Sequence, residues 1–218
     1  MLRRWLDPLP LVAILRGICP DEAAAVGHAL AEAGFRVLEV PLNSPQPFES
    51  IRRLTQSLGV DYLIGAGTVK TQAEVKEVAA VGGRLIVMPH TDSTLIRAAK
   101  KAGMVCVPGV TTPTEAFAAM AAGADGLKLF PAHQVTPEGL KAWSAVLPKA
   151  LPVLPVGGIT PDNMAPWIEA GAQGFGIGAA LYAPGVDSAE VALRAHAFAQ
   201  AFAQARLAIS TKSQGHRA

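Results

Sequence analysis

Short apolar runs recur along this chain at intervals of roughly 20 to 26 residues, the length that one strand, one helix and two short loops need. Eight such runs read as buried strands, at residues 11–15, 37–42, 63–67, 85–88, 105–107, 126–130, 153–156 and 175–178. Strands that are apolar almost throughout are typical of a parallel sheet with helices packed against it. The spacing therefore predicts an α/β protein built from repeated strand-helix units.

The segments between these runs are rich in alanine and carry signals that start and end helices. Helices are predicted over residues 22–33, 73–81, 94–102, 115–122, 138–146 and 163–170. Thr112 and Glu115 have the spacing of a capping box, and Thr160 precedes a proline that suits a first helical turn. Several helices should end at an Ala-Gly pair, such as the one at Gly34, because glycine adopts the left-handed conformation easily.

Eight units favour a closed (β/α)8 TIM barrel over an open sheet, because closure removes both sheet edges. The barrel is expected to be a single domain over residues 1–209, followed by a disordered tail over 210–218. The alternative is an open doubly wound sheet of the flavodoxin or Rossmann kind. The glycine-rich segment 174–178 falls in the last strand and lacks the spacing of a dinucleotide-binding fingerprint, which counts against that alternative.

Composition excludes several classes of protein. The 218 residues are 50% hydrophobic and 17% charged, which is ample apolar material for a large core. The formal net charge is +2 and the basic residues are scattered among acids, so a nucleic-acid partner is not expected. The apolar run that ends at Leu15 is too short to cross a membrane and is followed directly by Arg16, which predicts a cytoplasmic protein with no membrane partner.

The sequence contains no pattern of metal ligands. Cys19 and Cys106 lie far apart and are expected to be small buried side chains rather than ligands. His90 and His133 each follow a predicted strand, but neither has an acidic or cysteine partner at the spacing of a metal site. No metal is therefore expected, and both histidines are expected to line the mouth of the barrel or to be solvated.

Two charged residues occupy strand positions where a barrel should be apolar. Lys128 lies between Leu127 and Leu129, and if the two leucines face the helices, Lys128 faces the interior. Burial favours the neutral amine, which is the form that attacks a carbonyl. Glu39 occupies the same kind of position on the second strand and could act as a general acid/base beside the amine. The alternative is an internal ion pair with a structural role alone.

Arg16 and Thr68 end the first and third predicted strands, where barrel enzymes place their chemistry. A guanidinium and a hydroxyl there could hold a carboxylate, the arginine through a bidentate pair. Arg16 could instead form a surface salt bridge, and Thr68 could cap the following helix.

Glycine-rich segments mark the ends of the seventh and eighth strands, at 156–161 and 174–180. The loops at these places commonly bind phosphate in barrel enzymes, through backbone amides and a helix N-terminus. A phosphate site is therefore a candidate here, and the alternative is that the glycines serve tight turns only.

These segments together resemble the class I aldolases that cleave 2-dehydro-3-deoxy-6-phosphogluconate (KDPG) and its galactonate epimer (KDPGal). The resemblance spans residues 10–182 and rests on Ala-Ile-Leu-Arg-Gly at 13–17, Leu-Glu-Val-Pro-Leu-Asn-Ser-Pro at 38–45, Gly-Ala-Gly-Thr-Val at 65–69 and Leu-Lys-Leu-Phe-Pro at 127–131. It implies that Lys128 forms the Schiff base, that Glu39 is the general acid/base, and that no cofactor is needed.

The resemblance also implies the binding residues. Arg16 and Thr68 would hold the substrate carboxylate, Phe130 and Pro89 would wall the pocket, and the phosphate would lie near Gly157, Gly158, Gly178 and Ala179. Members of this family are typically trimers, so the resemblance implies a homotrimer.

Three departures from the gluconate branch bear on the substrate. Asn43-Ser44-Pro45 stands where that branch usually has an arginine and a threonine, and it looks like the galactonate branch. Val156 stands where that branch has a threonine, whose hydroxyl could favour one C4 configuration. Ala179 replaces a frequent serine and keeps only the backbone amide of that phosphate contact. We therefore expect KDPGal as the substrate, with KDPG or 4-hydroxy-2-oxoglutarate as alternatives.

The expected products are pyruvate and D-glyceraldehyde 3-phosphate, released through a Schiff base on Lys128. One rival is a phosphosugar isomerase or epimerase that uses Glu39 as a base. A rival from another class is a non-catalytic phosphosugar-binding barrel in which Lys128 only neutralises Glu39. Lys128 together with Arg16 favours the aldolase, because an isomerase needs neither an imine-forming amine nor a carboxylate clamp.

Overall fold

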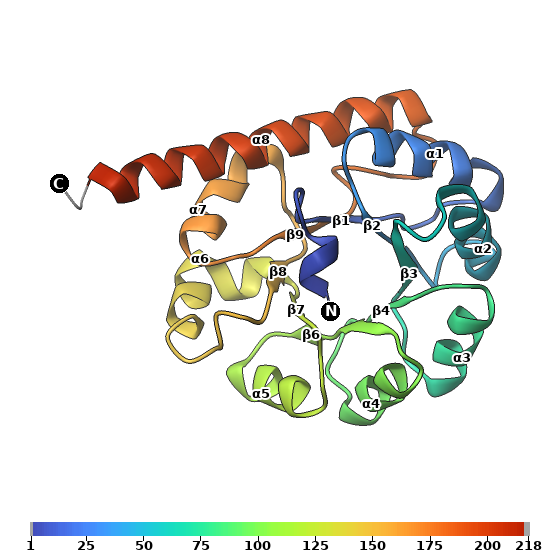
Figure 1. The fold of residues 1–218 in the computed structure, drawn as a ribbon, viewed down its shortest axis with the longest axis horizontal. Helices are drawn as coiled ribbons and strands as arrows, with labels where there is room; N and C mark the ends of the chain where they lie inside the picture. Colours follow the sequence, from blue (N-terminus) through green and yellow to red (C-terminus); the bar gives the residue numbers. More distant parts are fainter. Residues whose placement is uncertain (1, 216–218) are drawn as a thin grey trace.

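The computed structural model describes residues 2–215, with side chains for residues 2–211, and shows an α/β fold built on parallel strands. Figure 1 shows the strands grouped near the centre of the molecule with the helices around them. The strands are β1 (Leu11–Ile14), β2 (Val37–Pro41), β3 (Leu63–Gly67), β4 (Leu85–Val87), β5 (Val105–Val107), β6 (Gly109–Val110), β7 (Leu127–Leu129), β8 (Val153–Pro155) and β9 (Phe175–Ile177).

The strands pair in parallel as two sheets. Six strands follow the order β5-β4-β3-β2-β1-β9, and the other three follow the order β6-β7-β8. The two sheets meet at Pro108, which joins β5 to β6, and at a parallel bridge between Val156 and Gly176. β1 pairs with both β2 and β9, an order without the reversal that defines a doubly wound sheet. The strand order therefore does not support the doubly wound alternative.

All eight predicted strands are confirmed, with ends that differ by a residue at most, but the fifth continues into a short second strand. Pro108 follows Val107 directly, and proline has no N–H to donate to a ladder, so it separates β5 from β6. The Pro108 carbonyl still accepts a hydrogen bond from the Lys128 N–H at 2.9 Å. The chain thus passes from one sheet to the other beside Lys128.

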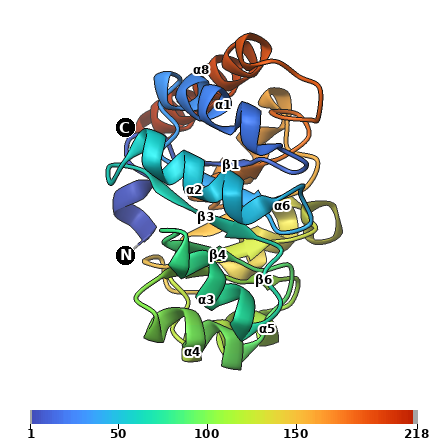
Figure 2. The same ribbon diagram turned by 90° about the vertical axis from the view of Figure 1, so that its right-hand side faces the viewer.

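The helices lie outside the strands, and Figure 2 shows α1 and α8 on one side with α3, α4 and α5 on the other. Their bounds are η1 (Leu2–Trp5), α1 (Pro20–Glu32), α2 (Pro47–Leu58), α3 (Gln72–Ala80), α4 (Ser93–Lys101), α5 (Pro113–Ala121), α6 (Ala132–Trp143), η2 (Pro161–Asn163), α7 (Met164–Glu169) and α8 (Ser188–Gly215). The capping box before α5 is confirmed, because Thr112 Oγ1 accepts from Glu115 N and Glu115 Oε2 accepts from Thr112 N. Gly34 follows α1 with a φ of 93°, as expected of a helix end.

Three expectations differ from the structure. The helix predicted over 138–146 begins earlier, as α6, and contains a break at Thr136 (φ 62°), next to Pro137, which cannot continue a helical ladder. Helix α8 runs past residue 209, and the tail prediction for residues 216–218 lies outside the described residues. Cys19 is exposed because it is the N-cap of α1, whereas Cys106 is buried as expected. Across residues 2–215, no helix combines the length and the apolar content that a membrane crossing requires.

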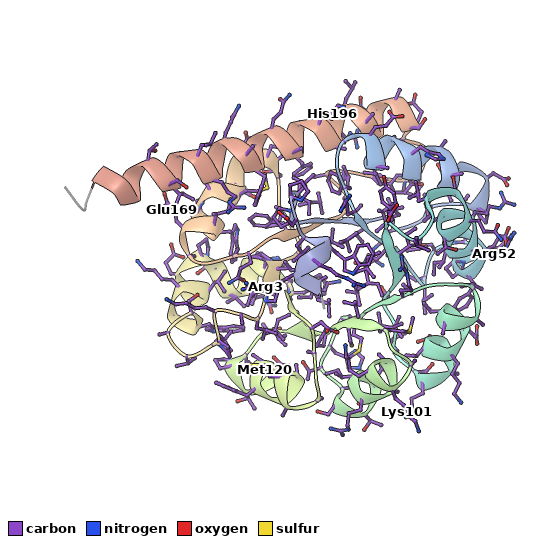
Figure 3. The ribbon with its side chains drawn as sticks, viewed as in Figure 1. Arg3, Arg52, Lys101, Met120, Glu169 and His196 are labelled. Carbon is purple, nitrogen blue, oxygen red and sulfur yellow. The ribbon has the colours of Figure 1, made fainter. Side chains whose placement is uncertain are left out.

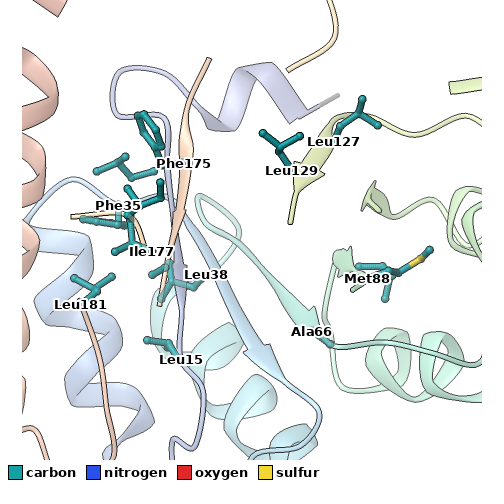
Figure 4. Close-up of a cluster of buried hydrophobic side chains, with 14 of the residues drawn as sticks. Leu15, Phe35, Leu38, Ala66, Met88, Leu127, Leu129, Phe175, Ile177 and Leu181 are labelled. Carbon is teal, nitrogen blue, oxygen red and sulfur yellow. The ribbon is translucent and has the colours of Figure 1, made fainter. Parts of the chain in front are cut away.

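Successive side chains along each strand point to opposite faces of the sheet, and the apolar ones form two clusters. The outer cluster packs against the helices and includes Leu15, Leu38, Ala66, Leu127, Leu129 and Ile177 (Figure 4). The inner cluster faces the other way and contains Leu2, Trp5, Leu6, Val12, Val37, Leu63, Leu85, Val87, Val105, Val107 and Leu154. The interior between the strands is therefore a packed core of its own, as the period of two requires.

Helix η1 closes one end of this interior. Leu2, Trp5 and Leu6 belong to the inner cluster together with Val37 and Leu63, which begin their strands. Figure 3 shows Arg3 of η1 near the centre of the ring, whereas its labelled residues on α2, α4 and α5 lie at the periphery. The amino ends of the strands are thus covered, and access to the interior is left to their carboxyl ends.

The close approach of β3 to β4 predicts that a side chain at Gly65 would destabilise the folded protein. Gly65 is opposite Leu85, and a Cβ at Gly65 would lie 2.0 Å from the Leu85 carbonyl oxygen, a backbone atom of the paired strand. We expect Gly65→Ala to lower the free energy of unfolding by about 1 to 3 kcal/mol, measured by urea denaturation. Gly178→Ala is the matched control, because its added methyl group meets no atom within 4 Å. Equal stability of the two variants would contradict this close approach.

Candidate active site

Lys128 on β7 and Glu39 on β2 point into the interior from different strands. Leu127 and Leu129 flank Lys128 in the outer cluster, and Leu38 does so for Glu39, so both charged side chains fall on the inner face. Lys128 is 5% exposed and Glu39 1% exposed. Lys128 Nζ lies 4.0 Å from Glu39 Oε1. The alternation of the sequence predicted this inward placement, and the structure brings the two groups together.

This ion pair is incomplete. A structural lysine-carboxylate pair closes to about 2.7 to 2.9 Å, where a charge-assisted hydrogen bond offsets the cost of burial. Here the two atoms are 4.0 Å apart, and Glu39 Oε2 is buried with no hydrogen-bond partner among the described residues. Two ionisable groups are therefore buried close together without satisfying one another, which is the arrangement of a site rather than of a core.

Burial decides the protonation of Glu39. Loss of hydration raises the pKa of the Glu39 carboxyl group above its usual value, and this effect exceeds the opposing attraction of Lys128 and then of Arg16. A carboxyl group with a raised pKa keeps its proton to a higher pH than an ordinary glutamate, so it can give a proton as well as take one. Glu39 is thus suited to move protons next to the amine.

Gly67 makes the room that Glu39 occupies. A Cβ at Gly67 would lie 1.6 Å from Glu39 Oε2, so any side chain larger than hydrogen would displace the carboxyl group. Gly67 is opposite Pro41 in the β2–β3 ladder, two residues beyond Glu39. Sequence reasoning missed this role, although the Gly-Ala-Gly pattern at 65–67 leaves two positions of one strand face without side chains.

Phe130 lies two residues after Lys128 on the same face of the chain. Lys128 Nζ is 4.8 Å from the centroid of the Phe130 ring, within range of a cation–π contact. Phe130 is half-buried and lines the same cavity as Lys128, so its ring forms part of the wall beside the amine.

A cavity of about 270 Å³ opens at the carboxyl ends of β1, β7, β8 and β9, with Lys128 in its wall. Its lining includes eight residues that the sequence singled out: Arg16, Lys128, Phe130, Val156, Gly157, Gly158, Gly178 and Ala179. Ile159, Thr160, Gly176 and Ala180 also line it and lie in the two glycine-rich segments that the sequence marked as a candidate phosphate site. Only Ile14 was in no candidate site, because an apolar residue inside a strand carries no chemical signal in the sequence.

Thr68 and Pro89 do not line this cavity. Thr68 is half-buried after β3 and has a φ of 59°, a left-handed conformation that is costly for a β-branched residue. It does not cap α3, because Thr71 is the N-cap of that helix, so the capping alternative is wrong. The structure therefore places Thr68 at the mouth in a strained conformation, without bringing it into the cavity that Arg16 lines.

Arg16 follows β1 and is exposed at the mouth of the cavity. Its Nη1 donates a hydrogen bond to Asn43 Oδ1 at 2.7 Å. The acceptor is a neutral amide, and no ion pair of Arg16 is found among the side chains of residues 2–211. The structure therefore does not show Arg16 in a surface salt bridge. Its positive charge is not neutralised and can attract an anionic ligand.

The turns after β8 and β9 line the same cavity. Gly157 and Gly158 have φ values of 104° and 74°, and Asn163 Nδ2 donates to the Gly158 carbonyl at 2.7 Å. After β9, the N–H groups of Leu181 and Tyr182 both donate to the Gly178 carbonyl, which makes one helical turn. The first amides of such a turn have no partner within it, so they can bind an anion.

His90 and His133 are exposed, as expected. Among the described residues, no three His, Cys, Asp or Glu side chains are grouped so that they could hold a metal ion.

A buried amine beside a buried carboxyl group, with the amine in the wall of a cavity that a guanidinium and two glycine turns also line, is typical of an enzyme that acts on a carbonyl compound with anionic groups. Comparison of this chain with known proteins identifies its family. A family model described as KDPG and KHG aldolase matches residues 3–183, and the chain belongs to this aldolase family.

Several relatives are similar over most of their length. The probable 2-dehydro-3-deoxy-6-phosphogalactonate aldolase of Rhizobium meliloti strain 1021 is 50% identical, over 88% of this chain and 91% of the relative. A solved structure described as native KDPGal has a TM-score of 0.90 at 47% identity, over 93% of this chain and 98% of that one. The KDPG aldolase of Legionella pneumophila, described with pyruvate captured as a covalent carbinolamine intermediate, has a TM-score of 0.73 at 27% identity, over 88% and 91%.

The raised pKa of Glu39 predicts a pH dependence of stability. Between the ordinary pKa of 4.5 and the raised pKa of the folded state, the folded protein keeps a proton on Glu39 that the unfolded chain releases. The stability that this proton contributes is complete below the ordinary pKa and is lost as pH rises through the raised, folded-state pKa. We expect the melting temperature of the native protein minus that of Glu39→Gln to fall as the pH rises from the ordinary pKa to the raised pKa of Glu39. A difference that grows with pH would show that Lys128 holds Glu39 as a carboxylate, as in a structural ion pair.

Proposed function

We propose that this chain is a class I aldolase that cleaves KDPGal to pyruvate and D-glyceraldehyde 3-phosphate. The observation that carries the proposal is the buried Lys128 amine, 4.0 Å from a carboxyl group that does not satisfy it, in the wall of an open cavity. The names of the relatives at 47 to 50% identity support the substrate.

We infer that the two sheets form one closed (β/α)8 barrel, a single domain over residues 1–209. Three observations support closure: the first and last strands pair, Pro108 alone separates β5 from β6, and Val156 bridges to Gly176 between β8 and β9. In such a barrel the carboxyl ends of the strands form one mouth, which is where the cavity lies.

In the proposed reaction, neutral Lys128 attacks the C2 ketone and loses water to form an iminium ion. Glu39 supplies and removes the protons, because its raised pKa lets it do both. The iminium accepts the electron pair of the C3–C4 bond once a base removes the C4 hydroxyl proton, and glyceraldehyde 3-phosphate leaves. The enamine on Lys128 is then protonated at C3 and hydrolysed to pyruvate, so the chemistry needs neither a metal nor a cofactor.

The substrate's anionic groups have separate candidate sites. Arg16 is suited to the carboxylate, because its charge is not neutralised by its neutral partner. Thr68 would contribute its hydroxyl to the carboxylate and Pro89 would complete the wall opposite Phe130, although neither lines the cavity in the structure described. The phosphate would bind the amides near Gly157, Gly158, Gly178 and Ala179. Ala179 can offer only its backbone there.

Val156 is proposed to set the preference at C4. It is 7% exposed, lines the cavity beside Lys128, and packs over Gly176, where a Cβ would lie 2.7 Å from Val156 Cγ2. Its apolar side chain cannot bind the C4 hydroxyl, which supports the galactonate epimer. KDPG and 4-hydroxy-2-oxoglutarate remain the alternative substrates.

The rival functions explain less of the geometry. A barrel that only binds phosphosugars would be served by a closed Lys128–Glu39 pair, which the 4.0 Å separation does not provide. An isomerase with Glu39 as its base needs neither an imine-forming amine nor a guanidinium for a carboxylate, and both line the cavity. The covalent pyruvate adduct described for the Legionella relative also supports imine chemistry. A homotrimer in the cytoplasm is expected from the family and stays a proposal.

Reductive trapping tests the covalent step. With pyruvate and borohydride, we expect a reduced pyruvyl adduct on Lys128, located by peptide mass spectrometry, because this buried amine faces the cavity. Lys128→Ala should abolish the adduct and the cleavage of KDPGal, whereas Lys141→Ala, at an exposed position of α6, should change neither. A chelator should have no effect. An adduct on another lysine, or activity lost to the chelator, would remove the basis of the proposal.

A second test concerns the configuration at C4. We expect the native enzyme to prefer KDPGal over KDPG, and Val156→Thr to shift the ratio of kcat/KM toward KDPG by roughly 5- to 30-fold, the worth of one hydrogen bond in a closed pocket. Trapping of pyruvate on Lys128 should be intact in the variant, and its melting temperature shows whether the buried hydroxyl alone perturbs the fold. An unchanged ratio would mean that Val156 does not choose the epimer.

A further inference from the structure

Two consecutive residues after β1 are joined to two consecutive residues after β2. Arg16 Nη1 donates to Asn43 Oδ1 at 2.7 Å, and the Gly17 N–H donates to Ser44 Oγ at 2.9 Å. Asn43 is exposed at the mouth, whereas Ser44 is 7% exposed. One bond therefore holds the side chain of Arg16, and the other holds the backbone of the next residue, Gly17.

The Arg16 loop is confined on its other side as well. Gly17 has a φ of 85°, and a Cβ there would lie 2.6 Å from Pro184 Cγ in the loop before α8. The backbone at Gly17, next to Arg16, thus lies between Ser44 and Pro184. The long arginine side chain is exposed and would lose several rotamers on binding a ligand. Asn43 is the residue that removes this freedom before a ligand arrives.

We propose that Asn43 is a positioning residue, which holds the Arg16 guanidinium in place for the substrate carboxylate. This rests on the proposed role of Arg16 in the aldolase. The chemistry of the acceptor matters, because an amide oxygen takes one N–H of the guanidinium without neutralising its charge. The remaining N–H groups can then form a bidentate pair with a carboxylate. A carboxylate at position 43 would hold Arg16 equally well but would compete with the substrate.

Steady-state kinetics of the condensation of pyruvate with glyceraldehyde 3-phosphate test the proposal. We expect Asn43→Ala to raise KM for pyruvate by about 5- to 10-fold with kcat nearly unchanged, because Arg16 must then be ordered at the expense of binding. Asn43→Asp should raise this KM at least as much. Gln56→Ala is the matched control, since Gln56 Oε1 accepts from Arg52 Nη1 at 2.8 Å on α2, away from the site, and its loss should leave KM unchanged.

A double-mutant cycle separates positioning from a structural role. If Asn43 acts through Arg16, Asn43→Ala should add nothing to the KM of an Arg16→Ala variant. Effects that add, an unchanged KM in Asn43→Ala, or a native KM in Asn43→Asp would overturn the proposal. An unchanged KM in Arg16→Ala alone would instead reject the carboxylate site itself, and borohydride trapping on Lys128 would then show whether the aldolase chemistry stands without it.

Discussion

The alternation of side chains along buried parallel strands is the constraint on which the rest of this structure depends. Each strand must satisfy helices on one face and the other strands on the opposite face, so a residue's parity decides which core it joins. Glu39 and Lys128 have the parity of the inner core. They cannot turn outward without a shift of register that would also move their leucine neighbours into the interior. The register that builds the hydrophobic core therefore also brings the amine to the carboxyl group.

The two ends of the strands differ for the same reason. Where the strands begin, the inner positions are apolar and Leu2, Trp5 and Leu6 cover them. Where the strands end, two inner positions are the charged Glu39 and Lys128, and the cavity that Lys128 lines opens beside glycines at the ends of β8 and β9. Chemistry is thus confined to one end because the other end is closed by packing.

Sequence reasoning could predict what depends on local pattern. The period of two placed Lys128 and Glu39 inside, the spacing of apolar runs located eight strands, and the Thr112–Glu115 spacing marked the start of α5. What it missed depends on approach between distant segments. The space that Gly67 leaves for Glu39, and the bond from Arg16 to Asn43, follow from the pairing of strands and loops, which no local pattern encodes. The positive φ of Thr68 was missed because a β-branched residue is among the least expected there.

The charged groups of the site share an unusual property, which is that each is left with unused bonding capacity. Glu39 Oε2 is buried without a partner, Lys128 stands 4.0 Å from the carboxyl group that could neutralise it, and Arg16 bonds to an amide instead of a carboxylate. In a core selected for stability alone these groups would be paired or replaced by apolar side chains, because unsatisfied buried charge is costly. A fold keeps such costs where a ligand completes the bonds, and the unsatisfied groups match the ligand of the proposed reaction: a carbonyl at Lys128, proton transfer at Glu39 and an anion at Arg16.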